Sequence, residues 1–166
     1  MSIVEAHEIV RDRRPPVADE RTTMLAFLRW HRQTLALKCA GLDPAQLARQ
    51  PLAPSALSLL GLVRHAADSE RFWFRQVMSG EAVVPRFAAF DVAGADAAEA
   101  FRAWRDEIAY ADRYLDAAPD LDVTGTEPGE GPVSLRWVIT HMLEEYARHN
   151  GHADLLREHL DGTVGL

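Results

Sequence analysis

Apolar residues recur at steps of three and four positions in four long segments of the chain. These segments run from about residue 21 to 40, 58 to 78, 96 to 117 and 134 to 160. The spacing puts the apolar side chains on one face of an α-helix, as in amphipathic helices that pack against one another. No segment shows a convincing strand pattern, so the sequence predicts an all-α protein.

Residues that begin and end helices stand between these segments. Asp43, Pro44 and Gln46 have the order of an N-cap, a first helical residue and a capping-box partner, which predicts one further short helix. Ser134 is a favourable N-cap for the fourth long helix, and Gly162 is placed to end it.

The connections between the predicted helices differ in length. Residues 79–96 form an irregular link that, at about 3.3 Å per residue, can cross a helix of roughly 30 Å, so the helices that it joins need not be antiparallel neighbours. Residues 119–133 are rich in Pro, Gly, Asp and Thr and are predicted to be a loop. Four long amphipathic helices in so short a chain predict a four-helix bundle over residues 21–166, with residues 1–20 as an N-terminal arm.

Composition and charge narrow the class of protein. A chain of 166 residues is long enough for one domain with its own core. The net charge of −7 argues against a nucleic-acid-binding protein, and no stretch approaches the roughly 18 apolar residues of a membrane-spanning helix. The first residues lack the apolar region of a secretory signal, and the single cysteine, Cys39, excludes an internal disulfide and a cysteine-rich metal site. We therefore expect a soluble, cytoplasmic protein.

The fourth predicted helix carries a pair of residues with metal-ligand spacing. Glu145 and His149 are four positions apart, so their side chains leave the same face of the helix about 5–6 Å from one another. The second helix offers His65 on the same side as Leu62 and Ser69, which is the side expected to face the core. A carboxylate in a bundle core is costly unless it is paired or bound to a metal. A metal site at these three residues is one interpretation, and hydrogen-bonded core side chains are the other.

Other histidines on the chain offer alternatives. His152 follows His149 by three positions, so these two form a rival ligand pair, while a supporting or partly exposed position is the simpler interpretation of His152. His141 lies one turn before Glu145 and is placed either to hydrogen-bond it or to pack in the core. His31 interrupts the apolar stripe of the first helix and is interpreted as a hydrogen-bonded core residue rather than one at the mouth of a site.

Aromatic and charged residues near these positions receive simpler interpretations. The tryptophans stand at helical spacing, which is more typical of core residues than of a substrate pocket: Trp30, Trp73, Trp104 and Trp137. Arg148 and Asn150 flank His149, where they either reach a polar thiol cofactor or belong to an exposed face. Glu70 and Arg71 are interpreted as exposed charges on the second helix.

Three separated segments resemble the DinB superfamily: ADERTTMLAFLRWHRQTLALKCAGL, SLLGLVRHAADSERFWF and SLRWVITHMLEEYARHNGHADLLREHLDG. They are most similar to its branch of mycothiol-dependent maleylpyruvate isomerases and mycothiol S-transferases, over roughly residues 18–162. The resemblance implies a four-helix bundle with a long crossover between the second and third helices. It also implies a divalent metal held by His65, Glu145 and His149, where many members have His-x-x-x-His in place of the Glu-x-x-x-His pair.

The chemistry expected of such a site follows from its ligands. Two histidines and one carboxylate leave a further coordination position open, which is the pattern of catalytic zinc; nickel, iron and manganese also suit this ligand set. Cys39 is interpreted as a core residue, so a thiol would come from outside the chain. The resemblance implies mycothiol, or another low-molecular-weight thiol, as cosubstrate of a transferase or isomerase acting on a small electrophile, and makes a homodimer plausible. The alternatives are a non-catalytic protein that binds metal and a small ligand, and a metal-dependent hydrolase in which Glu144 or His141 handles protons.

Overall fold

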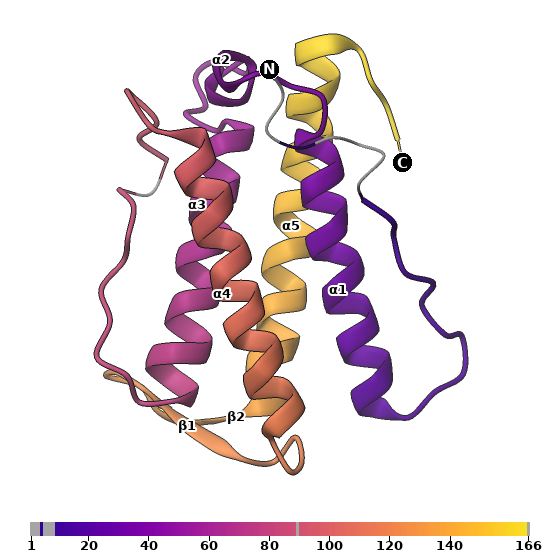
Figure 1. Cartoon of the computed structure of the whole chain (residues 1–166), viewed down its shortest axis with the longest axis vertical. Coiled ribbons are helices and arrows are strands. Elements are labelled where there is room, and N and C mark those ends of the chain that lie inside the picture. Colours follow the sequence, from indigo (N-terminus) through magenta and orange to yellow (C-terminus); the bar gives the residue numbers. More distant parts are fainter. Residues whose placement is uncertain (1–3, 5–8, 89, 166) are drawn as a thin grey trace.

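The structure, a computed structural model, describes residues 4, 9–88 and 90–165 and is mostly helical (Figure 1). Residues 1–3 and 5–8 of the predicted arm lie outside the described residues. The helices are α1 Glu20–Cys39, α2 Pro44–Ala48, α3 Leu59–Glu70, the π-helix η2 Arg71–Met78, α4 Ala97–Ala117 and α5 Leu135–Asp161. The strands are β1 Thr124–Glu127 and β2 Gly131–Ser134. Among the residues that the structure describes, no helix is both long and apolar enough to span a membrane.

The predicted caps begin and end the helices where the sequence places them. Asp43 accepts a hydrogen bond from the backbone N–H of Gln46, whose side chain accepts one in return, so the capping box of α2 is confirmed. Ser134 accepts from the N–H of Trp137 at the start of α5. Gly162 ends α5 in the left-handed conformation with φ of 78°, which glycine adopts without a steric cost.

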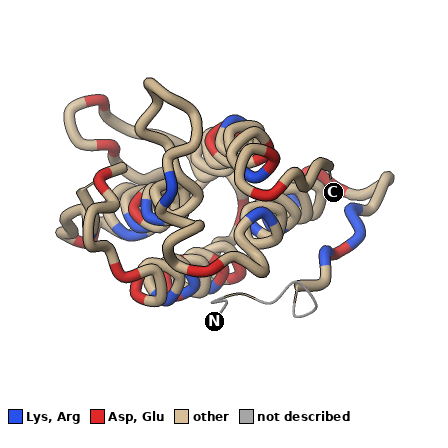
Figure 2. Tube along the Cα trace, turned by 90° about the horizontal axis from the view of Figure 1, so that it is seen from above, with Lys and Arg blue, Asp and Glu red and all other residues tan. Residues whose placement is uncertain are grey.

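The long helices lie side by side in two directions (Figure 1). In that view α1 and α5 run upward, whereas α3 and α4 run downward, so α3 and α4 are parallel. The described residues of the link, 79–88 and 90–96, return along the length of α3 to make this parallel connection, as the length of the link allows. Helix α1 packs against α5, and α3 packs against both α4 and α5. Figure 2 shows the helices end-on, with positively and negatively charged positions spread over them rather than separated by sign.

The mostly helical structure fits the predicted all-α class, but residues 119–133, predicted to be a loop, contain most of a short β-hairpin. Strands β1 and β2 pair antiparallel, with Thr124 opposite Ser134 and Glu127 opposite Gly131. Each strand has four residues in a segment rich in turn-forming residues, too short for an alternating pattern to show. The hairpin packs closely on η2, because a Cβ at Gly125 would lie 2.8 Å from the Cα of Met78.

The second predicted helix changes its winding part-way along. It begins after the N-cap Ser58 as α3, and from Arg71 onward it continues as the π-helix η2. The sequence between residues 62 and 78 contains no glycine or proline that would indicate this change. The predicted extent of this helical segment is therefore confirmed, whereas the prediction of one regular α-helix throughout its length is wrong.

A charged network stands at the centre of the helices and corrects the interpretation of Glu70 as an exposed charge. The Glu70 carboxylate is fully buried and accepts hydrogen bonds at 2.7 Å from both Nε and Nη2 of Arg32, which is itself only 4% exposed. Tyr146 donates its hydroxyl to the same carboxylate at 2.8 Å and accepts from the indole N–H of Trp104 at 2.8 Å. Arg32 also donates to Asp112 at 2.8 Å. The network therefore joins α1, α3, α4 and α5.

The crossover segment is tied to the helices that it passes. Arg71, also predicted to be exposed, is half-buried and donates at 2.9 Å to the buried carboxylate of Glu107 and at 3.1 Å to the carbonyl of Val84. The Asp68 carboxylate accepts from the backbone N–H groups of Arg86 and Phe87. These bonds hold the segment against α3, beside the turn of α3 that carries His65.

Candidate metal centre

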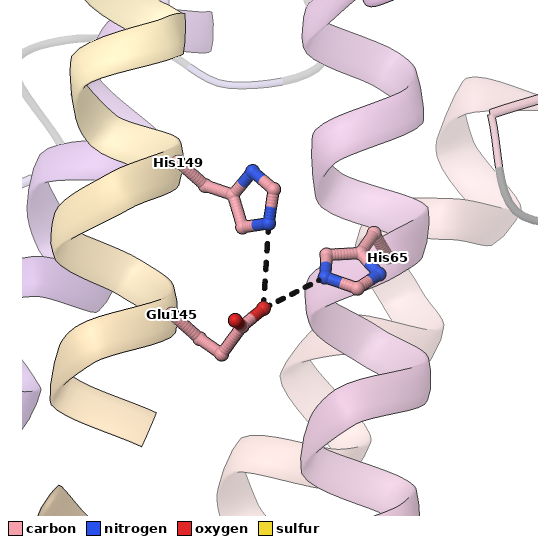
Figure 3. Close-up of side chains that lie close together, drawn as sticks. All are labelled: His65, Glu145 and His149. Carbon is pink, nitrogen blue, oxygen red and sulfur yellow. Dashed lines mark hydrogen bonds and ion pairs between the residues drawn. The ribbon is translucent and has the colours of Figure 1, made fainter. Parts of the chain in front are cut away.

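Two helices bring the three predicted ligands together (Figure 3). His65 projects from α3, and Glu145 and His149 project from one face of the neighbouring α5. Oε2 of Glu145 lies 3.1 Å from Nε2 of His65 and 3.4 Å from Nε2 of His149. The carboxylate therefore stands between the two imidazoles, as the dashed lines in Figure 3 show.

The spacing of these atoms suits a single small cation. Within the part of the chain that the structure describes, His65, Glu145 and His149 form the group whose ligand atoms all lie within 4.8 Å of one another. Tetrahedral zinc ligands at about 2.0–2.1 Å from the metal lie about 3.4 Å apart. Two of the separations are already close to that value, so the donor set fits a divalent metal with small movements of the side chains.

Burial and charge put two of these groups in the protonation state of a metal ligand. Burial acts to raise the pKa of Glu145, but the hydrogen bond from His65 and the charges of His149, His65 and His141 outweigh it, and the net pKa is lowered. Burial, followed by the charge of His65, lowers the pKa of His149 to about 4 despite the opposing effect of Glu145. At neutral pH the site therefore offers a carboxylate and a neutral imidazole at these two positions.

The cluster has a closed apolar side and an open side. The side chains of His65, Glu145 and His149 are 31%, 17% and 15% exposed, so solvent reaches the ligands from outside. Toward the core, the site is a cavity of about 10 Å³, roughly the room of one water molecule. Beside the three ligands it is lined by Leu35, Leu62, Ala66, Ser69, Met142 and Tyr146.

One neighbour of the site had no signal in the sequence. The Phe90 ring lies 5.5 Å from the ring centroid of His65 and 6.5 Å from that of His149. It belongs to the irregular crossover, where no periodic pattern marks which residues face inward. The position of Phe90 depends on the hydrogen bonds that hold the crossover segment against α3.

The other histidines take supporting or structural positions. Nδ1 of His152 lies 3.3 Å from Nδ1 of His149, so His152 contacts the nitrogen of His149 that faces away from Glu145. This matches the supporting interpretation of His152 and leaves the rival pairing with His149 without a third ligand in the described cluster. His31 contacts the amide of Asn150, in agreement with a hydrogen-bonded histidine.

Of the two polar residues that flank His149, Arg148 lies at the surface and Asn150 lies in the interior. Arg148 donates to Glu144 at 2.7 Å and reaches Glu145 at 3.4 Å, with about half of its side chain exposed. Asn150 is buried, and its amide N–H₂ group contacts His31, so it does not face the open side as Arg148 does. Of these two residues, Arg148 is therefore the one near the cluster that an external ligand can reach.

The thiol of the single cysteine, Cys39, is expected to be unreactive in the folded protein. Cys39 is 1% exposed, and burial raises the pKa of its thiol to about 12, so the thiol stays protonated at neutral pH. Native protein should therefore not react with Ellman's reagent at pH 8 within minutes, whereas protein unfolded in guanidinium should release one equivalent. Rapid labelling of the native protein, at a rate near that of the unfolded sample, would contradict this burial.

The mostly helical fold and the His–Glu–His cluster fit the DinB-like class that the sequence resembles. The family model described as Mycothiol-S-transferase matches residues 23–162, which is most of the chain. The chain belongs to this DinB-like family, which confirms the resemblance drawn from the three sequence segments. No curated protein matches the sequence.

Proposed function

We propose that the protein is a divalent-metal-dependent transferase that joins mycothiol, or a similar low-molecular-weight thiol, to a small electrophile. His65, Glu145 and His149 are the proposed metal ligands. The observation that carries the proposal is the convergence of their donor atoms within 4.8 Å, in a chain of the Mycothiol-S-transferase family. The arrangement of α1, α3, α4 and α5 is proposed to be the four-helix bundle with a long crossover that the resemblance implies.

Zinc is the proposed metal. Three protein ligands of nitrogen and oxygen type leave a coordination position for an exchangeable ligand, which is the pattern of catalytic zinc sites. The same two histidines and one carboxylate also suit nickel, iron or manganese, and metal analysis of the purified protein distinguishes these from zinc. A divalent cation at this position would supply a Lewis acid that lowers the pKa of a coordinating thiol.

The residues of the chain have distinct parts in this proposal. Glu145 and His149 present the carboxylate and the neutral imidazole that hold the cation, and His152 orients the ring of His149 through its Nδ1 atom. The mostly apolar lining of the cavity limits the inner face of the site to about the room of one water molecule. Arg148 stands on the open side as a cation for a polar group of the thiol.

A second candidate is a protein that binds metal and a small ligand without turnover. The apolar lining and small volume of the inner cavity favour it, because they offer few groups that move a proton. The open side of the cluster and the family membership favour the transferase. A homodimer and a cytoplasmic location stay predictions from the sequence.

A conjugation assay tests the proposal. Untagged protein is incubated with mycothiol and 1-chloro-2,4-dinitrobenzene; the thioether forms as chloride leaves and the thiol proton passes to solvent. We expect a rate above that of the reagents alone, which falls to background after chelation and returns with added zinc. Stoichiometric metal without conjugation across several thiols and electrophiles would favour the binding protein instead.

A further inference from the structure

Three aromatic rings form a shelf beside the candidate metal centre. Trp137 stacks almost parallel on His141, with ring centroids 5.2 Å apart and an interplanar angle of 4°. Trp73 of η2 lies against both, at 4.7 Å from His141 and 5.2 Å from Trp137. Trp73 is 7% exposed, whereas Trp137 is 45% exposed. We call these three residues the aromatic shelf: it has a buried base and an open outer ring.

The shelf continues the line of residues between α3 and α5 that includes the metal centre. Along α5, Trp137, His141 and Glu145 follow one another at four-residue steps, each about 6 Å along the helix axis. Trp73 follows His65 along the connected helices α3 and η2 and meets His141 across the interface. The shelf therefore begins about one helical turn from Glu145 and extends roughly one turn further.

The packing of the rings makes the exposed surface rigid. A lone surface tryptophan changes rotamer freely, but the ring of Trp137 is held by two other rings, one of them buried. A fixed, flat and partly exposed π surface favours a planar unsaturated group, which stacks on it with little loss of side-chain entropy. The earlier interpretation of the tryptophans as core residues holds for Trp73 and Trp104 but not for Trp137.

We propose that the aromatic shelf binds the planar, unsaturated part of the electrophile, so that the site favours aromatic electrophiles over small aliphatic ones. This inference rests on the proposed transferase function and specifies its substrate class. Trp137 is the specificity-determining residue, and His141 and Trp73 position its ring. Trp137 lies two four-residue steps, about 12 Å along the axis of α5, from Glu145, so a substrate that spans this length reaches the metal centre.

Selectivity between two electrophiles provides the kinetic test. With mycothiol as the thiol, kcat/KM is measured for 1-chloro-2,4-dinitrobenzene and for iodoacetamide, in the parent, Trp137→Ala and Trp137→Phe. We expect the aromatic-to-aliphatic ratio to fall about 2- to 12-fold in Trp137→Ala, the range of a lost stacking contact, and to be mostly restored in Trp137→Phe. Phe27→Ala, which removes a 37% exposed aromatic on α1, is the matched control and should leave the ratio unchanged.

A binding measurement separates this inference from the proposed function. Binding of 1,3-dinitrobenzene, a planar analogue without a leaving group, is measured by calorimetry on the metal-loaded protein and on the same variants. Weaker binding to Trp137→Ala but not to Phe27→Ala supports the shelf even when no conjugation is found. Equal binding to the parent and to Trp137→Ala overturns the shelf, as does an unchanged selectivity ratio. Loss of conjugation with retained probe binding counts against the transferase alone.

Discussion

Replacing Glu145 with alanine is expected to lower the affinity of the protein for its divalent metal by at least about 100-fold. The substitution removes one of three proposed ligands and the negative charge between His65 and His149. Loss of a residue that merely supports a metal ligand commonly costs 10- to 100-fold in affinity, so loss of a ligand should cost at least as much. Metal content by plasma mass spectrometry, on protein purified without an affinity tag or added metal, measures the effect.

Glu144, which directly precedes Glu145, provides a matched control for the loss of one negative charge. Glu144→Ala removes the same charge from the same turn of α5, but Glu144 is 60% exposed and pairs with Arg148. It should retain near-stoichiometric metal. His65→Ala and His149→Ala should behave as Glu145→Ala does, whereas His152→Ala should retain metal more weakly by about 10- to 100-fold. Near-stoichiometric metal in Glu145→Ala would show that this cluster is not the metal site.

Replacing Glu70 with alanine is expected to lower the free energy of unfolding by about 3–5 kcal/mol, the typical cost of removing one member of a buried ion pair. The change removes the bidentate partner of Arg32, whose guanidinium would stay buried with one carboxylate contact, to Asp112. It also removes the acceptor of the Tyr146 hydroxyl. Urea unfolding in the presence of a chelator measures this cost without a contribution from bound metal.

The other carboxylate that contacts Arg32, that of Asp112, supplies the control. Asp112→Ala removes a carboxylate that is 46% exposed, so solvent replaces much of its contact with Arg32 and the cost should be about 1 kcal/mol or less. Arg32→Met combined with Glu70→Leu should recover part of the stability lost in Glu70→Ala, because no unpaired charge is left in the core. Equal effects of Glu70→Ala and Asp112→Ala would contradict a central role for the buried pair.

The sequence around Glu70 contains a signal for a buried position, but that signal is ambiguous. Apolar residues stand three and four positions before it, at Ala66 and Ala67, and after it, at Trp73 and Phe74. This pattern indicates an inward position, yet a carboxylate is rarely buried without a partner. Its partner Arg32 lies 38 positions earlier on another helix, which no local pattern reveals.

The sequence by itself determined the features that depend on nearby residues. The extents of the long helices follow from apolar spacing, the capping box from Asp43 and Gln46 three positions apart, and the shared face of Glu145 and His149 from one helical turn. These are interactions within a few residues, so their geometry is that of the helix itself. The approach of His65 to this pair was predicted from its side of the second helix and from the family resemblance.

The tertiary structure alone decided the features that join distant segments. It set Phe90 near His65 and His149, buried Glu70 against Arg32, and placed Trp73 against Trp137 and His141. Each of these contacts depends on how separate helices and the crossover pack, and packing is a collective result of many weak contacts at long sequence separation. Residue spacing therefore predicts which side chains share a face, whereas only the packed chain decides what that face meets.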